Sequence, residues 1–250
     1  MLAKGTTALV TGGSGGIGSA LVRMLAGTGV HTIALSNDRE KLALLDGTAN
    51  VETVFMDVTD AEGLRRAFSG RPVDILVNAA GVLGVTGTLY SVPHASARHI
   101  VDVNVVGVHN CLSAVVPGMV ARNRGHVVNV GSLAGPYPSA GQPMYSASKA
   151  AIHNMSSNLR MELFGTDVRV TEIRPGRVRT GMHAEMFDGD HARANELLYD
   201  PYECLRPEDI AEAIRYVLST PPHVCVAQIE VVPTHQVVGG TKMHQRAPAG

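Results

Sequence analysis

The chain has 250 residues, of which 45% are apolar and 17% are charged, and its formal net charge at pH 7 is −1. These values are typical of one soluble α/β domain, and the near-zero charge gives no sign of a nucleic-acid or membrane partner. We find neither a signal peptide nor an apolar run of the roughly 20 residues that a spanning helix needs. Three cysteines without a C-x-x-C spacing indicate reduced thiols in the cytoplasm, and eleven histidines without an H-x-x-x-H spacing predict no metal site.

Short apolar runs alternate with longer stretches of helical periodicity along the whole chain. Such an alternation predicts β–α units and therefore a parallel sheet. With no repeat and no linker, we expect a single domain over residues 1–232 and a loosely held tail, or an arm on a neighbouring subunit, over residues 233–250. The expected strands are Thr6–Val10, His31–Leu35, Val51–Met56, Val73–Val77, His126–Gly131, Val168–Ile173 and Ala227–Val232.

The first expected strand leads into a glycine-rich turn and then into a helix expected over Ser19–Gly27. Glycines allow the backbone to turn sharply and to approach a pyrophosphate, and the helix N-terminus offers free N–H groups to the phosphates. This arrangement favours a dinucleotide site over the alternative, a turn that binds nothing. Two motifs overlap in the turn: Gly13, Gly15 and Gly18 fit G-x-G-x-x-G, and Gly12, Gly16 and Gly18 fit T-G-x-x-x-G-x-G.

The end of the second expected strand bears on the choice between NAD(H) and NADP(H). An acidic residue would bind the ribose 2′-hydroxyl of NAD here, roughly 20 residues after the glycines, but the chain has Ser36 and Asn37. Arg39 is placed to reach a 2′-phosphate, the alternative being a solvent-exposed residue of the first helical turn, and Asp38 is expected to cap that helix. The missing carboxylate favours NADP(H) and leaves NAD(H) open.

The next two strand ends also carry residues that suit a dinucleotide. Asp57 is placed to accept a hydrogen bond from the adenine amino group, with the N–H of Val58 nearby. The alternative is that Asp57 only caps the following helix, a role that we assign to Asp60. The fourth strand ends in N-A-A-G at residues 78–81, whose small side chains leave room for a flat ligand.

Tyr145 and Lys149 are four residues apart, which places both side chains on one face of a helix. An ammonium at about 5 Å favours the phenolate by roughly 3 kcal/mol at an effective dielectric constant of about 20, so we expect the pKa of Tyr145 to be lowered. Ser132 follows a buried apolar run and is placed to hydrogen-bond a substrate oxygen. The alternative is a chance pair on a solvated helix, which the dinucleotide motif upstream disfavours.

Seven motifs follow one another along the chain: T-G-G-S-G-G-I-G at Thr11–Gly18, D-V at Asp57–Val58, N-A-A-G at Asn78–Gly81, V-N-V-V-G at Val103–Gly107, N-V-G-S at Asn129–Ser132, Y-S-A-S-K at Tyr145–Lys149 and P-G-R-V-R-T at Pro175–Thr180. In this order and spacing they resemble the short-chain dehydrogenase/reductase family, over residues 6 to about 232. The resemblance implies a single-domain α/β Rossmann fold, with seven parallel strands in the order 3-2-1-4-5-6-7 and helices on both faces.

The resemblance also implies a catalytic tetrad. Tyr145 would be the acid/base, Lys149 would lower its pKa and bind the nicotinamide ribose, and Ser132 would orient the substrate oxygen. Asn104 would hold a water that links Lys149 to solvent. Because Asn104 lies in a long helical stretch and Asn is a poor helix former, we expect a local distortion there, the alternative being an exposed polar residue.

The cofactor contacts implied by the resemblance extend over most of the chain. The chain departs from the family pattern in three ways: Ala79 is the second residue of N-N-A-G, Gly15 stands where some NADP-preferring members carry Arg or Lys, and Ser-Asn at residues 36–37 is neither of the commonest choices. Pro175, Val178 and Thr180 would hold the nicotinamide carboxamide. The other contacts would come from Gly12, Ser14, Gly16, Ile17, Gly18, Ser36, Asn37, Arg39, Asp57, Val58, Asn78, Ala79, Gly81, Tyr145 and Lys149.

We therefore expect reversible hydride transfer between NADP(H) and a carbonyl or secondary alcohol of a small molecule. The segment Pro207–Val232 resembles the branch of NADP-dependent 3-hydroxy-acid and carbonyl reductases that includes clavulanic-acid-type reductases. Residues 181–201 resemble the family's mobile substrate lid. Lid residues expected near the substrate are Met182, His183, Met186, Phe187, His191 and Tyr199, together with Leu83, Tyr137 and Met144 from elsewhere.

Two other functions stay open from the sequence. An isomerase or dehydratase would use the same tyrosine and lysine with a bound dinucleotide, and a non-catalytic sensor would keep the fold alone. A sensor would be expected to lack Tyr145 or Lys149, and the chain has both. The resemblance further implies a homotetramer or a homodimer.

Overall fold

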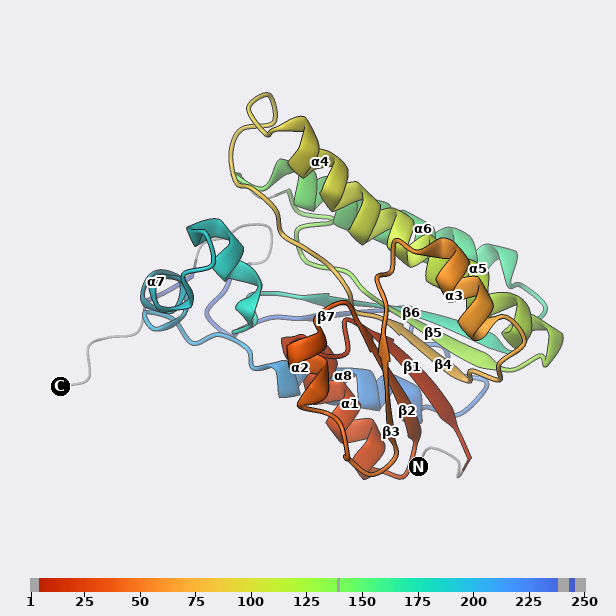
Figure 1. The fold of residues 1–250 in the computed structure, drawn as a ribbon. Coiled ribbons are helices and arrows are strands. Elements are labelled where there is room, and N and C mark those ends of the chain that lie inside the picture. Colours follow the sequence, from red (N-terminus) through yellow and green to blue (C-terminus); the bar gives the residue numbers. More distant parts are fainter. Residues whose placement is uncertain (1–4, 139, 238–242, 246–250) are drawn as a thin grey trace.

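The structure is a computed structural model that describes residues 5–138, 140–237 and 243–245. Seven parallel strands form one sheet in the order β3-β2-β1-β4-β5-β6-β7, with helices on both faces (Figure 1). The expected Rossmann fold and strand order are therefore confirmed. The strands are β1 Thr7–Thr11, β2 His31–Ser36, β3 Val51–Phe55, β4 Ile75–Asn78, β5 Gly125–Val130, β6 Val168–Pro175 and β7 Gln228–Val231.

Two layers of helices enclose the sheet (Figure 1). One face carries α1 (Gly16–Gly27), the short α2 (Arg39–Ala43) and α8 (Pro207–Ser219). The other face carries α3 (Ala61–Phe68), α4 (His94–Val101), α5 (Gly107–Ala121) and α6 (Pro143–Glu162). Beyond β6, residues 181–199 form short helical turns, of which α7 (His191–Ala194) is one.

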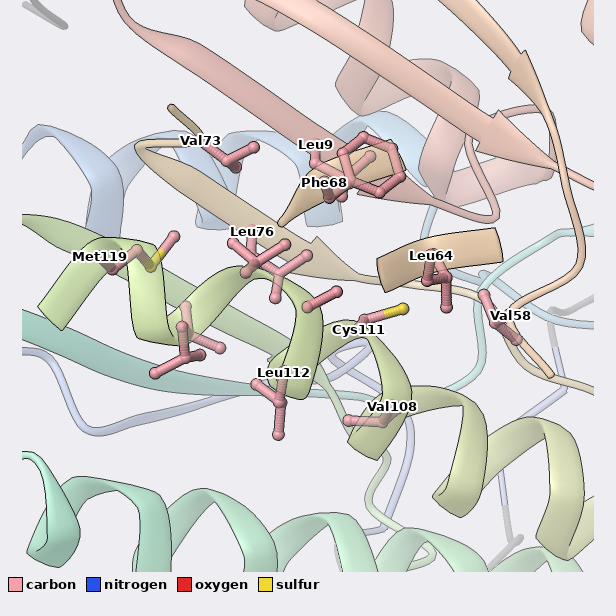
Figure 2. Close-up of a cluster of buried hydrophobic side chains, with 14 of the residues drawn as sticks. Leu9, Val58, Leu64, Phe68, Val73, Leu76, Val108, Cys111, Leu112 and Met119 are labelled. Carbon is pink, nitrogen blue, oxygen red and sulfur yellow. The ribbon is translucent and has the colours of Figure 1, made fainter. Parts of the chain in front are cut away.

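Each central strand sends alternate side chains into two separate cores. Leu9 and Leu76 point into the core under α3 and α5 (Figure 2), whereas Val10 and Val77 point into the core under α1 and α8. Because both faces are covered, the strands are continuous apolar runs rather than alternating ones. This is why all seven strands were found in the sequence to within two residues at each end.

Helix ends follow local capping chemistry. The carboxylate of Asp38 accepts the backbone N–H of Lys41, and that of Asp60 accepts the N–H of Gly63, so both expected caps are confirmed. The first helix begins at Gly16, three residues before the expected start, because the glycines that suggested a turn also form its first helical turn. That first turn carries no side-chain cap.

One helical stretch among the described residues, His94–Ala121, is long and apolar enough to cross a membrane. This stretch was not expected from the sequence, because charged residues near its start interrupt the apolar run. Of its most apolar window, 61% is buried against the rest of the protein. A core helix of a globular domain passes the same test, so this stretch is weak evidence for a span.

Two neighbouring leucines after α2 test how the fold is stabilised. Leu45 is 1% exposed in the core under α1, whereas Leu44 is 72% exposed. We expect Leu45→Ala to lower the free energy of unfolding by about 2–5 kcal/mol, since it removes buried apolar surface and leaves a cavity. Leu44→Ala should change it by less than about 0.5 kcal/mol. Urea denaturation followed by circular dichroism measures both, and equal losses would contradict this packing.

Candidate active site

Two hollows meet at the carboxyl ends of the strands. The larger, of about 560 Å³, runs from the glycine-rich turn to Tyr145 and Lys149, and we call it the cleft. The smaller, of about 330 Å³, lies under residues 182–186, and we call it the inner pocket. Ser132 and Tyr145 line both. A molecule in the inner pocket would therefore meet a ligand of the cleft at these two side chains.

The glycine-rich turn at one end of the cleft has no room for side chains. Gly12 has a φ of +64°, and a Cβ there would lie 2.8 Å from the backbone of Ala80. A Cβ at Gly18 would overlap the carbonyl of Gly12. Since the first turn of α1 has no side-chain cap, its N–H groups face the cleft at the positive end of the helix dipole. This cradle fits the diphosphate of a dinucleotide.

The same end of the cleft is also lined by Ser36, Asn37 and Lys41. The hydroxyls of Ser36 and Ser14 are 2.7 Å apart, and the Lys41 ammonium forms an ion pair with Asp38 at 2.7 Å. Arg39 departs from expectation: it does not line the cleft, and its guanidinium lies 4.0 Å above the Phe55 ring. Lys41, which sequence reasoning missed, is the basic residue of the lining at this end.

Asp57 lines the cleft as expected, beside Val58. Burial alone would raise the pKa of the Asp57 carboxyl, but hydrogen bonds from Thr59 and from the Asn37 amide hold that pKa below its usual range. Asn78 departs from expectation, because it is buried and does not line the cleft. Its amide donates to Asn129 at 2.9 Å.

Asn104 lies in a π-helical turn, Asp102–Val106, between α4 and α5. The distortion expected from an Asn in this stretch is therefore present. The buried Asn104 amide accepts the N–H of Val82 at 2.8 Å and donates to the carbonyl of Val82 at 2.9 Å and to the hydroxyl of Ser148 at 3.0 Å. Ser148 in turn donates to the carbonyl of Tyr145 at 2.7 Å. Asn104 does not line the cleft, but it ties the strand-end loop to the helix of Tyr145 and Lys149.

Tyr145 and Lys149 both line the cleft from α6, and the Lys149 ammonium lies 5.7 Å from the centre of the Tyr145 ring. Desolvation raises the pKa of Tyr145, a hydrogen bond with Ser132 opposes this, and the charge of Glu185 adds to it. This corrects the expected lowering by Lys149. The ammonium donates to the carbonyl of Val130 at 2.9 Å, and burial lowers its own pKa to about 8 against the charge of Glu172.

The expected lid lies over the hollows and is held to the loop after β4. The Glu185 carboxylate accepts the N–H groups of Leu83 and Gly84, both at 3.0 Å. Met182, His183 and Met186 line the inner pocket, as do Leu83 and Tyr137, and His191 lines the cleft. The expected Met144 lies outside both linings, Phe187 contacts Arg193 instead, and Tyr199 is buried outside both linings.

The other residues expected to bind the cofactor line the cleft. In the described part of the chain no three His, Cys, Asp or Glu residues are grouped as metal ligands. Of the expected tail, Gln236 reaches back to the N–H of Arg177, whereas residues 238–242 and 246–250 lie outside the described residues. The cleft lining includes Gly12, Ser14, Gly16, Ile17, Gly18, Ala79, Gly81, Ser132, Pro175, Val178 and Thr180.

The fold and the cleft define a Rossmann-type protein, and comparisons with known proteins give its family. The short chain dehydrogenase family model matches residues 6–191. A short-chain type dehydrogenase/reductase of Sinorhizobium fredii is 38% identical over 94% of both chains, and the NADP-dependent 3-hydroxy acid dehydrogenase YdfG of Escherichia coli is 35% identical over 95% of this chain and 99% of its own. The chain therefore belongs to the short-chain dehydrogenase family, which confirms the expected class of oxidoreductase.

Solved structures agree with this assignment. The closed form of serine dehydrogenase complexed with NADP⁺ superposes with a TM-score of 0.89, at 34% identity over 96% of this chain and 100% of that one. Serine dehydrogenase from Escherichia coli gives a TM-score of 0.78 at 33% identity, over 93% of this chain and 100% of that one. The likeness covers the fold from end to end.

The buried ammonium of Lys149 predicts a specific dependence of stability on pH. The pKa is about 8 in the folded protein and 10.5 for the free side chain, so between these values the unfolded chain binds more protons. The cost of the buried charge is therefore complete below pH 8 and is relieved as the pH rises toward 10.5, a gain on the order of 3 kcal/mol.

Lys149→Met should remove this gain. We expect the difference in free energy of unfolding, wild type minus variant, to increase with pH across this window when urea denaturation is measured on the protein without ligand. A difference that stays constant, or that decreases, would contradict the burial of a charged Lys149.

Proposed function

We propose that the protein catalyses reversible hydride transfer between NADP(H) and a carbonyl or secondary alcohol of a small molecule. The observation that carries the proposal is the hydrogen-bonded pair of Ser132 and Tyr145, which lies where the cleft meets the inner pocket. The glycine turn that fits a diphosphate supports it, as do relatives and a solved structure named for NADP.

In the proposed reaction the bound dinucleotide supplies hydride during reduction or takes it up during oxidation. Ser132 donates a hydrogen bond to the substrate carbonyl oxygen and fixes its position. Tyr145 gives its proton to that oxygen as the carbon is reduced, and it takes the proton back in the reverse direction. A raised pKa keeps Tyr145 protonated at neutral pH, which suits the reductive direction. Lys149 sits beside the ring, and its ammonium polarises this end of the cleft.

Tyr145→Phe tests the proton transfer directly. The variant keeps the ring and its packing but loses the hydroxyl, so turnover should fall by about 10²–10⁴-fold while NADPH affinity stays within about threefold. Oxidation of NADPH and of NADH with a panel of carbonyl compounds measures turnover, and calorimetry measures affinity. Near wild-type rates in this variant would contradict the role of Tyr145.

The same panel separates the alternatives. Net consumption of NADPH marks an oxidoreductase. An isomerase or a dehydratase would convert a substrate without net consumption, and a sensor would bind the dinucleotide without any turnover. No specific observation in the structure favours either alternative.

The choice of NADP over NAD rests on Lys41, which we propose binds the 2′-phosphate. Lys41→Gln should raise the KM for NADPH about 3- to 10-fold and leave the KM for NADH unchanged, because only NADPH carries the 2′-phosphate; the effect should shrink at high salt. Arg39→Gln is the matched control, since Arg39 stacks on Phe55 outside the cleft lining. If Arg39→Gln gives the larger effect, the assignment of Lys41 is wrong.

The proposal extends to the setting of the enzyme. By its resemblance to the family we propose a cytoplasmic homotetramer or homodimer, with residues 181–201 as a substrate lid on a domain of residues 1–232. The contact of Glu185 with the loop at residues 83–84 supports the lid, because it connects two segments about a hundred residues apart across the inner pocket.

A further inference from the structure

The inner pocket has apolar and uncharged polar side chains in its lining and carries one full positive charge. Leu83, Leu133 and Met186 form much of its wall, and Ser132 and Tyr145 lie where it opens to the cleft. Among its lining residues there is no Asp or Glu, and Arg177 is the sole Lys or Arg. A cation in a partly apolar pocket without an acidic neighbour in the lining is suited to binding an anion.

Arg177 is held in place by the surrounding chain. Its backbone N–H donates to the Gln236 side chain at 2.8 Å, and its backbone carbonyl accepts the N–H of Leu205 at 3.0 Å. Its guanidinium donates to the carbonyl of Leu198 at 3.2 Å. The guanidinium also lies 5.2 Å from the centre of the Tyr202 ring. In the described part of the chain no carboxylate forms an ion pair with Arg177, and one of its five N–H donors is committed, to Leu198.

His183, beside Arg177 in the pocket, adds no competing charge. Tyr199 donates its hydroxyl proton to the carbonyl of Thr180 at 2.7 Å, so His183 Nδ1, also 2.7 Å from that hydroxyl, must donate to it. This leaves Nε2 of a neutral imidazole as an acceptor. Burial, and then the charge of Arg177, lower the pKa of His183 to about 4, which agrees with the neutral ring.

We propose that Arg177 binds the carboxylate of the substrate, which makes the substrate a small hydroxy acid or the corresponding oxo acid. The proposal rests on the function proposed above. With the carboxylate on Arg177, the hydroxyl-bearing carbon lies toward Ser132 and Tyr145. During oxidation that carbon gives a hydride to the bound oxidised dinucleotide and its hydroxyl gives a proton to the deprotonated form of Tyr145, while the carboxylate is unchanged.

The experiment compares a charged substrate with its neutral ester. The probes are 3-hydroxybutyrate and methyl 3-hydroxybutyrate, with NADP⁺ as cosubstrate. Arg177→Gln should lower kcat/KM for the acid about 10- to 100-fold, mainly through KM, and change that for the ester by less than about threefold, because only the acid makes charge-assisted hydrogen bonds with the guanidinium. Arg177→Lys should restore part of the loss, since it keeps the charge without the planar fork.

Arg179→Gln is the matched control. It removes a guanidinium two residues away that is already paired with Asp200 at 2.6 Å and lies outside the pocket lining, so the preference for the acid should persist. Equal losses for acid and ester in Arg177→Gln, or an equal preference for both in the wild type, would overturn the proposal.

Binding separates the failure of this inference from the failure of the proposed function. Calorimetry with NADP⁺-saturated Tyr145→Phe protein measures 3-hydroxybutyrate affinity without turnover. Binding that is lost in the Tyr145→Phe, Arg177→Gln double variant supports the carboxylate site even if no probe is turned over. Turnover of neutral carbonyl compounds together with no binding of the acid would overturn the carboxylate site and keep the proposed reaction.

Discussion

Parallel pairing of seven strands is the constraint on which the site depends. Because all strands run the same way, their carboxyl ends meet at one edge of the sheet, and the chain must leave that edge through loops. The turn after β1, the loop after β4 and the segment after β6 all meet there (Figure 1). Residues as distant in sequence as Gly12, Tyr145 and Thr180 therefore line one cleft.

Buried polar contacts also hold the residues that we propose for catalysis. Both the oxygen and the nitrogen of the Asn104 amide are hydrogen-bonded, and through Ser148 this residue connects the loop after β4 to α6. Lys149 is held by the Val130 carbonyl and by the charge of Glu172, which is fully buried. Removal of any one partner would leave a buried polar group unpaired, which costs about 1–3 kcal/mol of free energy. The arrangement therefore resists small displacements.

The sequence was sufficient wherever a local pattern determines the structure. Two covered faces make the strands visible as apolar runs, and an Asn within a helical stretch indicated a local distortion, which the structure shows to be a π-helical turn. The sequence was insufficient where the structure depends on the direction in which a side chain points, or on the balance between burial and charge that determines a pKa. Whether Arg39 or Lys41 faces the cleft depends on the rotation of a short helix, and the pKa of Tyr145 depends on burial that spacing cannot reveal. Arg177 carried no signal, because only the structure shows which side of its extended segment faces the pocket.

Three arginines on that segment show why its charge matters. Arg174 pairs with Glu172 at 2.9 Å and Glu230 at 3.1 Å, and Arg179 pairs with Asp200. The protein thus neutralises the guanidinium groups that serve its own structure. Arg177 lies between them in the sequence. Its guanidinium donates to a backbone carbonyl and stacks on an aromatic ring, and within the described residues it forms no ion pair with a carboxylate. Since an unpaired charge beside an apolar wall costs free energy, its position next to the Ser132–Tyr145 junction is best explained by a negative charge that arrives with the ligand.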